Sequence, residues 1–166
     1  MVFQRRFRTA GIAALAAVAV TTIATSSASA DPSPPPGCTG TPSNTWLNVS
    51  AQGLRNGSGL LAITLYADNP RKFLVSRGSL YVGRVNANAG GTTGCIFVPA
   101  PGVYAIALYH DENANQRFDR TGIGLPAEGY GFSNNPATLA GLPSFRSVRL
   151  NVPRSGLTTR IQMKYP

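Results

Sequence analysis

The residues best suited to chemistry in this chain form one short segment rich in acids and amides. Their spacing is D-x-N-x-N-x-x-x-D, which places side-chain oxygens at alternate positions of a turning backbone. Hard cations such as Ca²⁺ prefer oxygen ligands in this arrangement. The segment is therefore a candidate calcium loop. Its predicted ligands are Asp111, Asn113, Asn115, Arg117 (through the backbone carbonyl), Asp119 and, from further along the chain, Glu128.

Two positions of this loop depart from the usual calcium pattern. Gln116 stands at the sixth position, where Gly permits the sharp turn, and Gly122 stands at the twelfth, where a Glu is the bidentate ligand. A turn whose Asn and Asp side chains cap their own backbone explains the same residues without a cation. Both interpretations stay open. For calcium, a dissociation constant on the order of 10⁻⁴ to 10⁻³ M is expected, as in extracellular modules.

His110, the only histidine, directly precedes the acidic segment. A hydrolase that uses His110 with Asp119 or Glu128 is a remote alternative, because a lone histidine at a strand end more often has a structural role. Ser133 is not surrounded by a G-x-S-x-G motif. We therefore predict a non-enzymatic protein with no catalytic residues.

The segment 122–135 is rich in glycine and carries aromatic side chains between the glycines. Such aromatic residues either cover a core or form a platform for a ligand. The alternative function is therefore a structural or interaction module that docks an envelope protein or a glycan through this segment. The predicted interaction surface consists of His110, Tyr130, Phe132 and Asn134.

Most of the chain outside these segments alternates apolar and polar residues with a period of two, which is typical of half-buried strands. Seven or eight such strands predict an all-β fold, an antiparallel sandwich of the immunoglobulin or transthyretin kind, with a closed barrel as the alternative. The segment 111–143 is expected to be one long ordered loop, because it contains apolar side chains that can pack. The strands are expected within 47–50, 61–66, 73–77, 80–85, 95–98, 103–110, 148–152 and 157–165.

Residues 1–30 have the features of a cleaved signal peptide. Three arginines precede an Ala-rich apolar run, and a small-x-small site ends at residue 30. The run is too short for a membrane span, and no second one follows in the mature chain. We expect an exported protein, periplasmic or extracellular, with a Pro-rich segment at 31–44 and one domain at 45–166.

Cys38 and Cys95 are the only cysteines, and an oxidising compartment favours one disulfide between them. On the chain-entropy model this bond stabilises the fold by roughly 4 kcal/mol. Removal of the three leader arginines leaves 12 of the 15 basic residues against 6 acidic ones, a balance of +6. The basic residues are spread along expected strands, and no nucleic-acid motif is present, so nucleic acid is not an expected partner.

Two blocks of this sequence resemble a known bacterial family. They are PGVYA through HDENAN, within 101–115, and GLPAEGYGFSN, at 124–134. Both resemble the family of domains of unknown function numbered 2141 (DUF2141), and the resemblance extends from about Thr45 to Tyr165. It implies an exported β-sandwich without an established activity and supplies no catalytic residue. The family pattern has Gly after the second Asn, so Gln116 is a departure that weakens the calcium interpretation.

Overall fold

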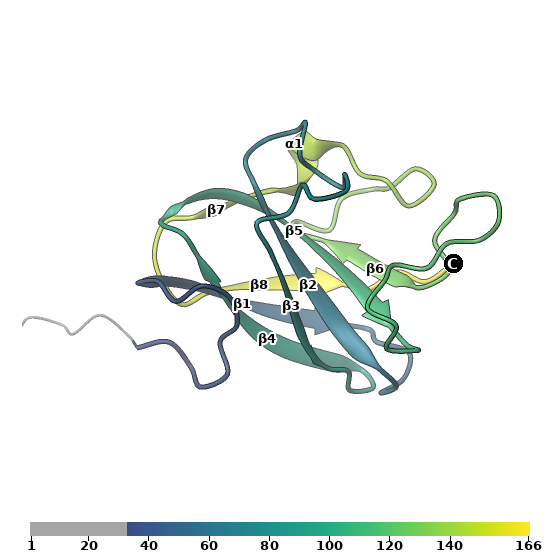
Figure 1. The fold of residues 1–166 in the computed structure, drawn as a ribbon, viewed down its shortest axis with the longest axis horizontal. Helices are drawn as coiled ribbons and strands as arrows, with labels where there is room; N and C mark the ends of the chain where they lie inside the picture. The colour runs from purple at the N-terminus through teal and green to yellow at the C-terminus, as the bar shows by residue number, and fades with distance from the viewer. Residues whose placement is uncertain (1–32) are drawn as a thin grey trace, which may run out of the picture. The chain divides into compact units, whose positions relative to one another are not determined.

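The computed structural model describes residues 33–166, and nearly all of their regular structure is β-strand (Figure 1). The predicted signal peptide, residues 1–30, lies outside the described residues. The elements are β1 (Thr45–Gln52), β2 (Leu60–Ala67), β3 (Tyr81–Asn86), β4 (Gly91–Val98), β5 (Gly102–Asp111), β6 (Gly129–Phe132), α1 (Phe145–Val148), β7 (Arg149–Val152) and β8 (Leu157–Gln162).

The strands form two sheets that pack as a sandwich. The first has the order β4-β1-β8, and the second has the order β3-β2-β5-β6, with β7 also paired to β5 (Figure 1). The prediction of an all-β sandwich is confirmed. The pairing of β1 with β8, which sets Leu47 beside Leu157, is parallel. All other pairings between the described strands are antiparallel.

Alternation of side chains along each strand places one row from each sheet in a shared core. Leu47 and Val49 of β1 face Ile63 of β2 and Ile106 and Leu108 of β5, and all five side chains are buried. The intervening residues of β2 and β5 therefore point to the outer face of the second sheet, where they are available for other contacts.

The expected strand at 73–77 is absent, and this prediction was wrong. The connection between β2 and β3 is a series of turns in which Leu74 and Arg77 have φ angles of 55° and 58°. These left-handed conformations interrupt extended backbone. Phe73 in this connection packs against Tyr66 and Phe132 on the outer face of the second sheet. The apolar residues of this segment thus cover a sheet and do not form one.

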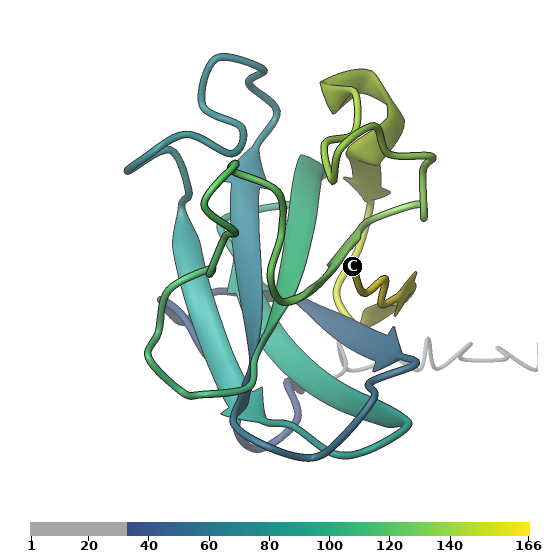
Figure 2. The ribbon, with the colours of Figure 1, turned by 90° about the vertical axis from the view of Figure 1, so that its right-hand side faces the viewer.

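The segment 111–143, which was expected to be one long loop, is ordered as expected, but the short strand β6 interrupts it. β6 pairs with β5 on one side, and on the other side Tyr130 exchanges two backbone hydrogen bonds with Lys164. Figure 2 shows the connection between β5 and β6 (green) passing in front of the second sheet. The four residues of β6 are too few for an alternating sequence pattern to predict this strand. The segment therefore presents β6 and two tight loops, 119–127 and 139–142, beside β5.

The predicted disulfide is present and joins Cys38 in the N-terminal segment to Cys95 in β4. Thr39 adds backbone hydrogen bonds to Cys95 and Phe97, which extend this attachment to the first sheet. Within residues 33–166, no helix has the length and apolar character needed to cross a bilayer.

Candidate functional site

Asp111 ends β5, and its buried carboxylate folds the acidic loop back toward the strand. Its Oδ1 accepts the backbone N–H of Asn115 at 2.9 Å, and its Oδ2 accepts that of Gln116 at 2.7 Å. Ala114 and Gln116 adopt left-handed conformations, with φ of 56° and 63°. The loop therefore makes its sharp turns with Gln116 at the sixth position, where a calcium loop usually has glycine.

The amide side chains of the loop point toward Asp119. The Nδ2 atoms of Asn113 and Asn115 donate to Asp119 Oδ2 at 2.8 and 2.9 Å, while their Oδ1 atoms accept backbone N–H groups of Asn115 and Arg117. These are the capping turns of the structural interpretation. Among the described residues, no group of three or more His, Cys, Asp or Glu side chains is arranged to hold a metal ion.

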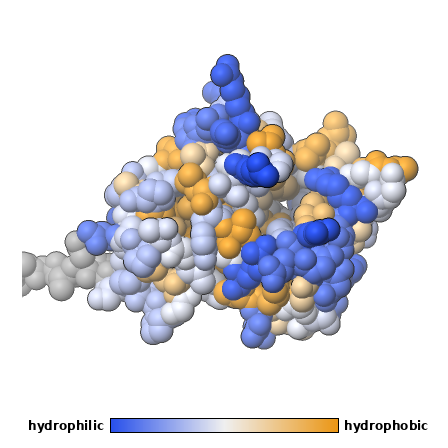
Figure 3. Space-filling view, viewed as in Figure 1, coloured by the Kyte–Doolittle hydropathy of each residue, from blue (hydrophilic) through white to orange (hydrophobic). Residues whose placement is uncertain are grey.

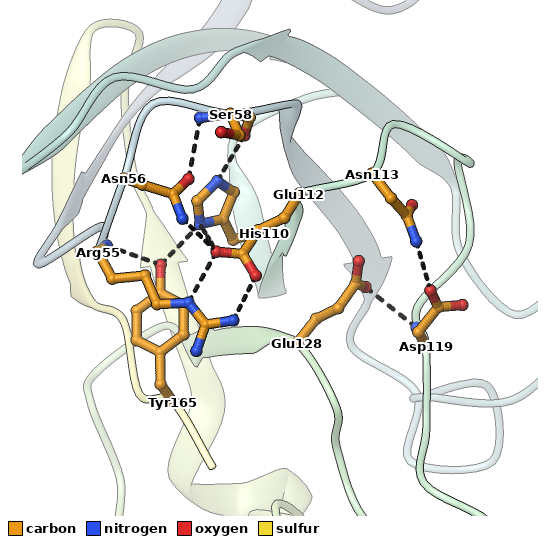
Figure 4. Close-up of polar contacts among 9 residues, drawn as sticks. All are labelled: Arg55, Asn56, Ser58, His110, Glu112, Asn113, Asp119, Glu128 and Tyr165. Carbon is orange, nitrogen blue, oxygen red and sulfur yellow. Dashed lines mark hydrogen bonds and ion pairs between the residues drawn. The ribbon is translucent and has the colours of Figure 1, made fainter.

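Glu128 lies just before β6 and is buried, with 5% of its surface exposed. Its Oε2 accepts the backbone N–H of Asp119 at 3.0 Å, but its Oε1 is buried without a hydrogen-bond partner (Figure 4). Burial raises the pKa of the Glu128 carboxyl, and the negative charges of Asp119 and Asp111 raise it further. The backbone N–H of Asp119 opposes this rise through its hydrogen bond, and the N–H of Glu112 opposes it more weakly, without hydrogen-bond geometry to Oε1. The predicted ligands Asp111 and Asp119 thus lie close enough to Glu128 to act on its carboxyl electrostatically.

Glu112, near the start of the acidic loop (residues 111–119), has its negative charge paired with an arginine. Two hydrogen bonds from Arg55, one of them from Nε to Oε1 at 2.7 Å, hold the carboxylate of Glu112, and Asn56 donates a third at 2.7 Å (Figure 4). Hydrogen bonding from Arg55 lowers the pKa of the Glu112 carboxyl. The Arg55 guanidinium also lies 4.7 Å from the centre of the Tyr165 ring.

His110 is fully buried beside Glu112, with both ring nitrogens engaged. Nε2 lies 2.8 Å from the Ser58 carbonyl oxygen, which can only accept, so Nε2 carries the proton. Nδ1 lies 2.7 Å from the Tyr165 hydroxyl, which donates to it when the ring is neutral. The ring is fully buried, does not belong to the lining of the groove described below, and hydrogen-bonds to Tyr165 and Ser58 and not to Asp119 or Glu128.

A groove of about 580 Å³ lies on the outer face of the second sheet. The strands place alternate aromatic side chains there, and the small side chain of Ala107 in β5 leaves space between them. Figure 3 shows apolar groups (orange) in a hollow of this face, bordered by hydrophilic ones (blue). Five aromatic residues and one arginine line the groove: Tyr66, Tyr109, Phe118, Tyr130, Phe132 and Arg120.

The predicted interaction surface is divided between this groove and the interior. Tyr130 and Phe132 line the groove. His110 does not, and the amide of Asn134 instead donates to the carbonyls of Ser147 and Arg149, where it ties two segments together. The sequence analysis missed the other aromatic residues of the groove. Outward-facing aromatic residues in β2 and β5 were the signal for them, but only the observed register brings them together.

Comparison with known protein families gives one match, which covers residues 49–161 and is described as an uncharacterised protein conserved in bacteria, DUF2141. The chain belongs to the DUF2141 family. This confirms the resemblance seen in the sequence, and the DUF2141 match includes the acidic loop, β6 and every strand of the second sheet. No curated protein sequence and no solved structure matches the chain.

Proposed function

We propose that this DUF2141 protein is an exported binding module that docks a segment of a partner protein in the groove of the second sheet. Its main support is the groove lining, in which five of the residues are aromatic. Protein interfaces are enriched in aromatic residues and arginine, and these residues carry much of the binding energy. The volume of the groove is in the range of ligand sites, about 300–1,000 Å³.

The apolar loops around the groove favour a protein partner over a glycan. Leu74, Val75 and Leu142 line it and are exposed, and the adjoining loop tips carry Ile123 and Leu139, which are 84% and 85% exposed. Figure 3 shows apolar groups (orange) that project on the right-hand side of this view. Exposed apolar side chains gathered around a groove are typical of a protein or membrane contact. Apolar side chains of a partner would be shielded from water here.

Positive charge around the groove predicts acidic residues in the partner. Arg120 lies over the Phe118 ring at 5.0 Å, and the exposed loop that supplies Leu74 also carries Arg71, Lys72 and Arg77. Complementary charge steers association and selects partners. The expected ligand is therefore a protein segment whose apolar side chains are flanked by Asp or Glu.

Export is the second element of the proposal. The Cys38–Cys95 disulfide is of the type that persists in oxidising compartments, and it agrees with the leader-like features of residues 1–30. The partner would then be another protein of the envelope or the extracellular space.

A displayed random-peptide library, selected against the mature chain, tests the proposal. Enriched peptides should combine apolar side chains with Asp or Glu. Ala107→Phe, which fills the groove, and Arg120→Glu, which reverses its charge, should each weaken the selected peptides about tenfold or more in calorimetric titrations, a loss of roughly 1.4 kcal/mol. Arg154→Glu is the control matched to Arg120→Glu, because it makes the same change of charge at an exposed residue in the turn before β8, outside the groove lining.

Two results would contradict this function. Equal peptide binding by the wild type and by the Ala107 and Arg120 variants would place the contact elsewhere. Failure to enrich any peptide, together with binding to a glycan panel, would exclude the protein partner.

A further inference from the structure

We propose that Glu128 and the acidic loop bind a divalent cation of the calcium type. This proposal uses different residues from the groove and does not depend on the groove binding a protein. Five carboxylate side chains lie in the described residues 33–166. Two of them, Glu112 and Asp68, form ion pairs with arginines. The other three form no ion pair with any described residue: Asp111 and Asp119 belong to the acidic loop, and Glu128 contacts it through the backbone N–H of Asp119.

The distribution of charge makes this cluster unusual. Residues 33–166 contain 12 basic side chains, more than twice the number of acidic ones, yet none of them forms an ion pair with these three carboxylates. The nearby arginines Arg117 and Arg120 are exposed, and Arg120 donates to the Gly124 carbonyl oxygen. A small cation can reach an interior site that these long side chains leave unpaired.

Glu128 provides the independent observation that points to a ligand. Its side chain is buried and directed toward the acidic loop, and its Oε1 atom has no hydrogen-bond partner (Figure 4). A buried polar oxygen without a partner costs free energy, and a buried unpaired charge costs more. A cation beside Oε1 would remove this cost and would explain an acidic residue at this position.

The amides of the loop indicate where the cation would lie. Asn113 and Asn115 both direct amide hydrogens at Asp119 Oδ2, so two partial positive charges occupy the position next to this carboxylate. Rotation of each amide about its terminal bond exchanges its nitrogen for its oxygen, and it breaks the hydrogen bonds that the two Oδ1 atoms accept from the backbone N–H groups of Asn115 and Arg117. The site would then offer the carboxylates of Asp119 and Glu128 and two amide oxygens, while Asp111 keeps the loop folded through its backbone contacts.

The chemistry of this donor set selects the class of cation. All of the donors are oxygens, and neither of the two cysteines nor the histidine belongs to the set, since these are engaged elsewhere. Oxygen-only sites suit hard cations and do not suit zinc or copper. Because the amides must rotate before they can bind, affinity at the weak end of calcium sites is expected, with a dissociation constant on the order of 10⁻⁴ to 10⁻³ M.

Thermal unfolding of the mature chain with added CaCl₂ tests the proposal. At about 10 mM CaCl₂ the melting temperature should rise by roughly 3–10 °C relative to NaCl of the same ionic strength. Glu128→Gln keeps an oxygen that can accept the N–H of Asp119 but removes the charge, and it should abolish the rise. Asp119→Asn should do the same and serves if Glu128→Gln fails to fold. The control Asp68→Asn, which affects a carboxylate paired with Arg149, should keep the full rise.

The proposal would be overturned by either of two results. One is a wild-type melting temperature that CaCl₂ and NaCl affect equally. The other is a calcium response that persists in both Glu128→Gln and Asp119→Asn. Peptide binding in the groove is measured separately, with Ala107 and Arg120 variants, so failure of one proposal is distinguishable from failure of the other.

Discussion

Glu112 and Glu128 stand near the two ends of the connection between β5 and β6, and their environments are opposite. Arg55 and Asn56 hold the Glu112 carboxylate with hydrogen bonds, and its pKa is lowered. Glu128 is buried beside two other carboxylates with one oxygen unpartnered, and its pKa is raised. The difference separates a carboxylate whose charge is paired with arginine from one that has no ion-pair partner among the described residues.

The same contrast occurs between adjacent residues of β5. His110 points inward and has a partner at each ring nitrogen, whereas Tyr109 points outward and lines the groove. Alternation along β5 therefore places the hydrogen-bonded network of His110, Tyr165 and Ser58 on the inner face of the sheet and the groove on its outer face. The groove lies on the outer side of the second sheet, and the aromatic side chains there are available to a ligand.

The largest loss of stability is expected when the hydrogen-bonded network around His110 is broken. His110→Ala removes a fully buried ring and leaves the Tyr165 hydroxyl and the Ser58 carbonyl without their partner. The free energy of unfolding should fall by about 3–4 kcal/mol, as measured by urea denaturation. A loss below about 1 kcal/mol would mean that this network does not hold the fold together.

A matched truncation in the groove should cost less. Tyr130 is only partly buried, and its hydroxyl makes one long contact, of 3.4 Å, with Thr138. Tyr130→Ala should lower the free energy of unfolding by about 1–2 kcal/mol while it abolishes the binding of groove-selected peptides. Undiminished peptide binding in this variant would remove Tyr130 from the docking surface.

Neutralising the two glutamates should shift stability in opposite directions. Glu112→Gln breaks the pair with Arg55 and should lower the free energy of unfolding by about 0.5–1 kcal/mol at neutral pH. Glu128→Gln removes an unpaired buried charge and should raise it by about 1 kcal/mol in calcium-free buffer. Denaturant titrations of both variants check this contrast, and two losses of similar size would contradict it.

The smallest effect concerns the dependence of stability on pH. Because its pKa is raised, Glu128 favours folding when protonated, so this contribution declines as pH rises from the ordinary glutamate value of 4.5 through the folded pKa. The lowered pKa of Glu112 gives the opposite sign, with stability present above 4.5 and lost as pH falls through the folded value. Glu128→Gln should therefore remove a decline in stability above pH 4.5, which unfolding curves at several pH values would detect.

The sequence was sufficient for the sandwich because its strands alternate clearly, and for the disulfide because Cys38 and Cys95 have no other partner. It was misleading at 73–77, where apolar residues that cover a sheet resemble a strand. The groove depends on the register of β2, β5 and β6 and on the loops that meet above them, and a single sequence carries no such register. The composition of the acidic loop could be read directly, but the missing partner of Glu128 appears only in three dimensions.

The contrast between Glu112 and Glu128 is tested most directly by carboxyl ¹³C NMR of the protein during a CaCl₂ titration at fixed pH. The Glu128 resonance should shift and saturate at millimolar calcium, together with that of Asp119, while the Glu112 resonance stays in place. A titration in which Glu128 does not move, or in which Glu112 moves equally, would contradict the assignment of one glutamate to the fold and the other to a ligand.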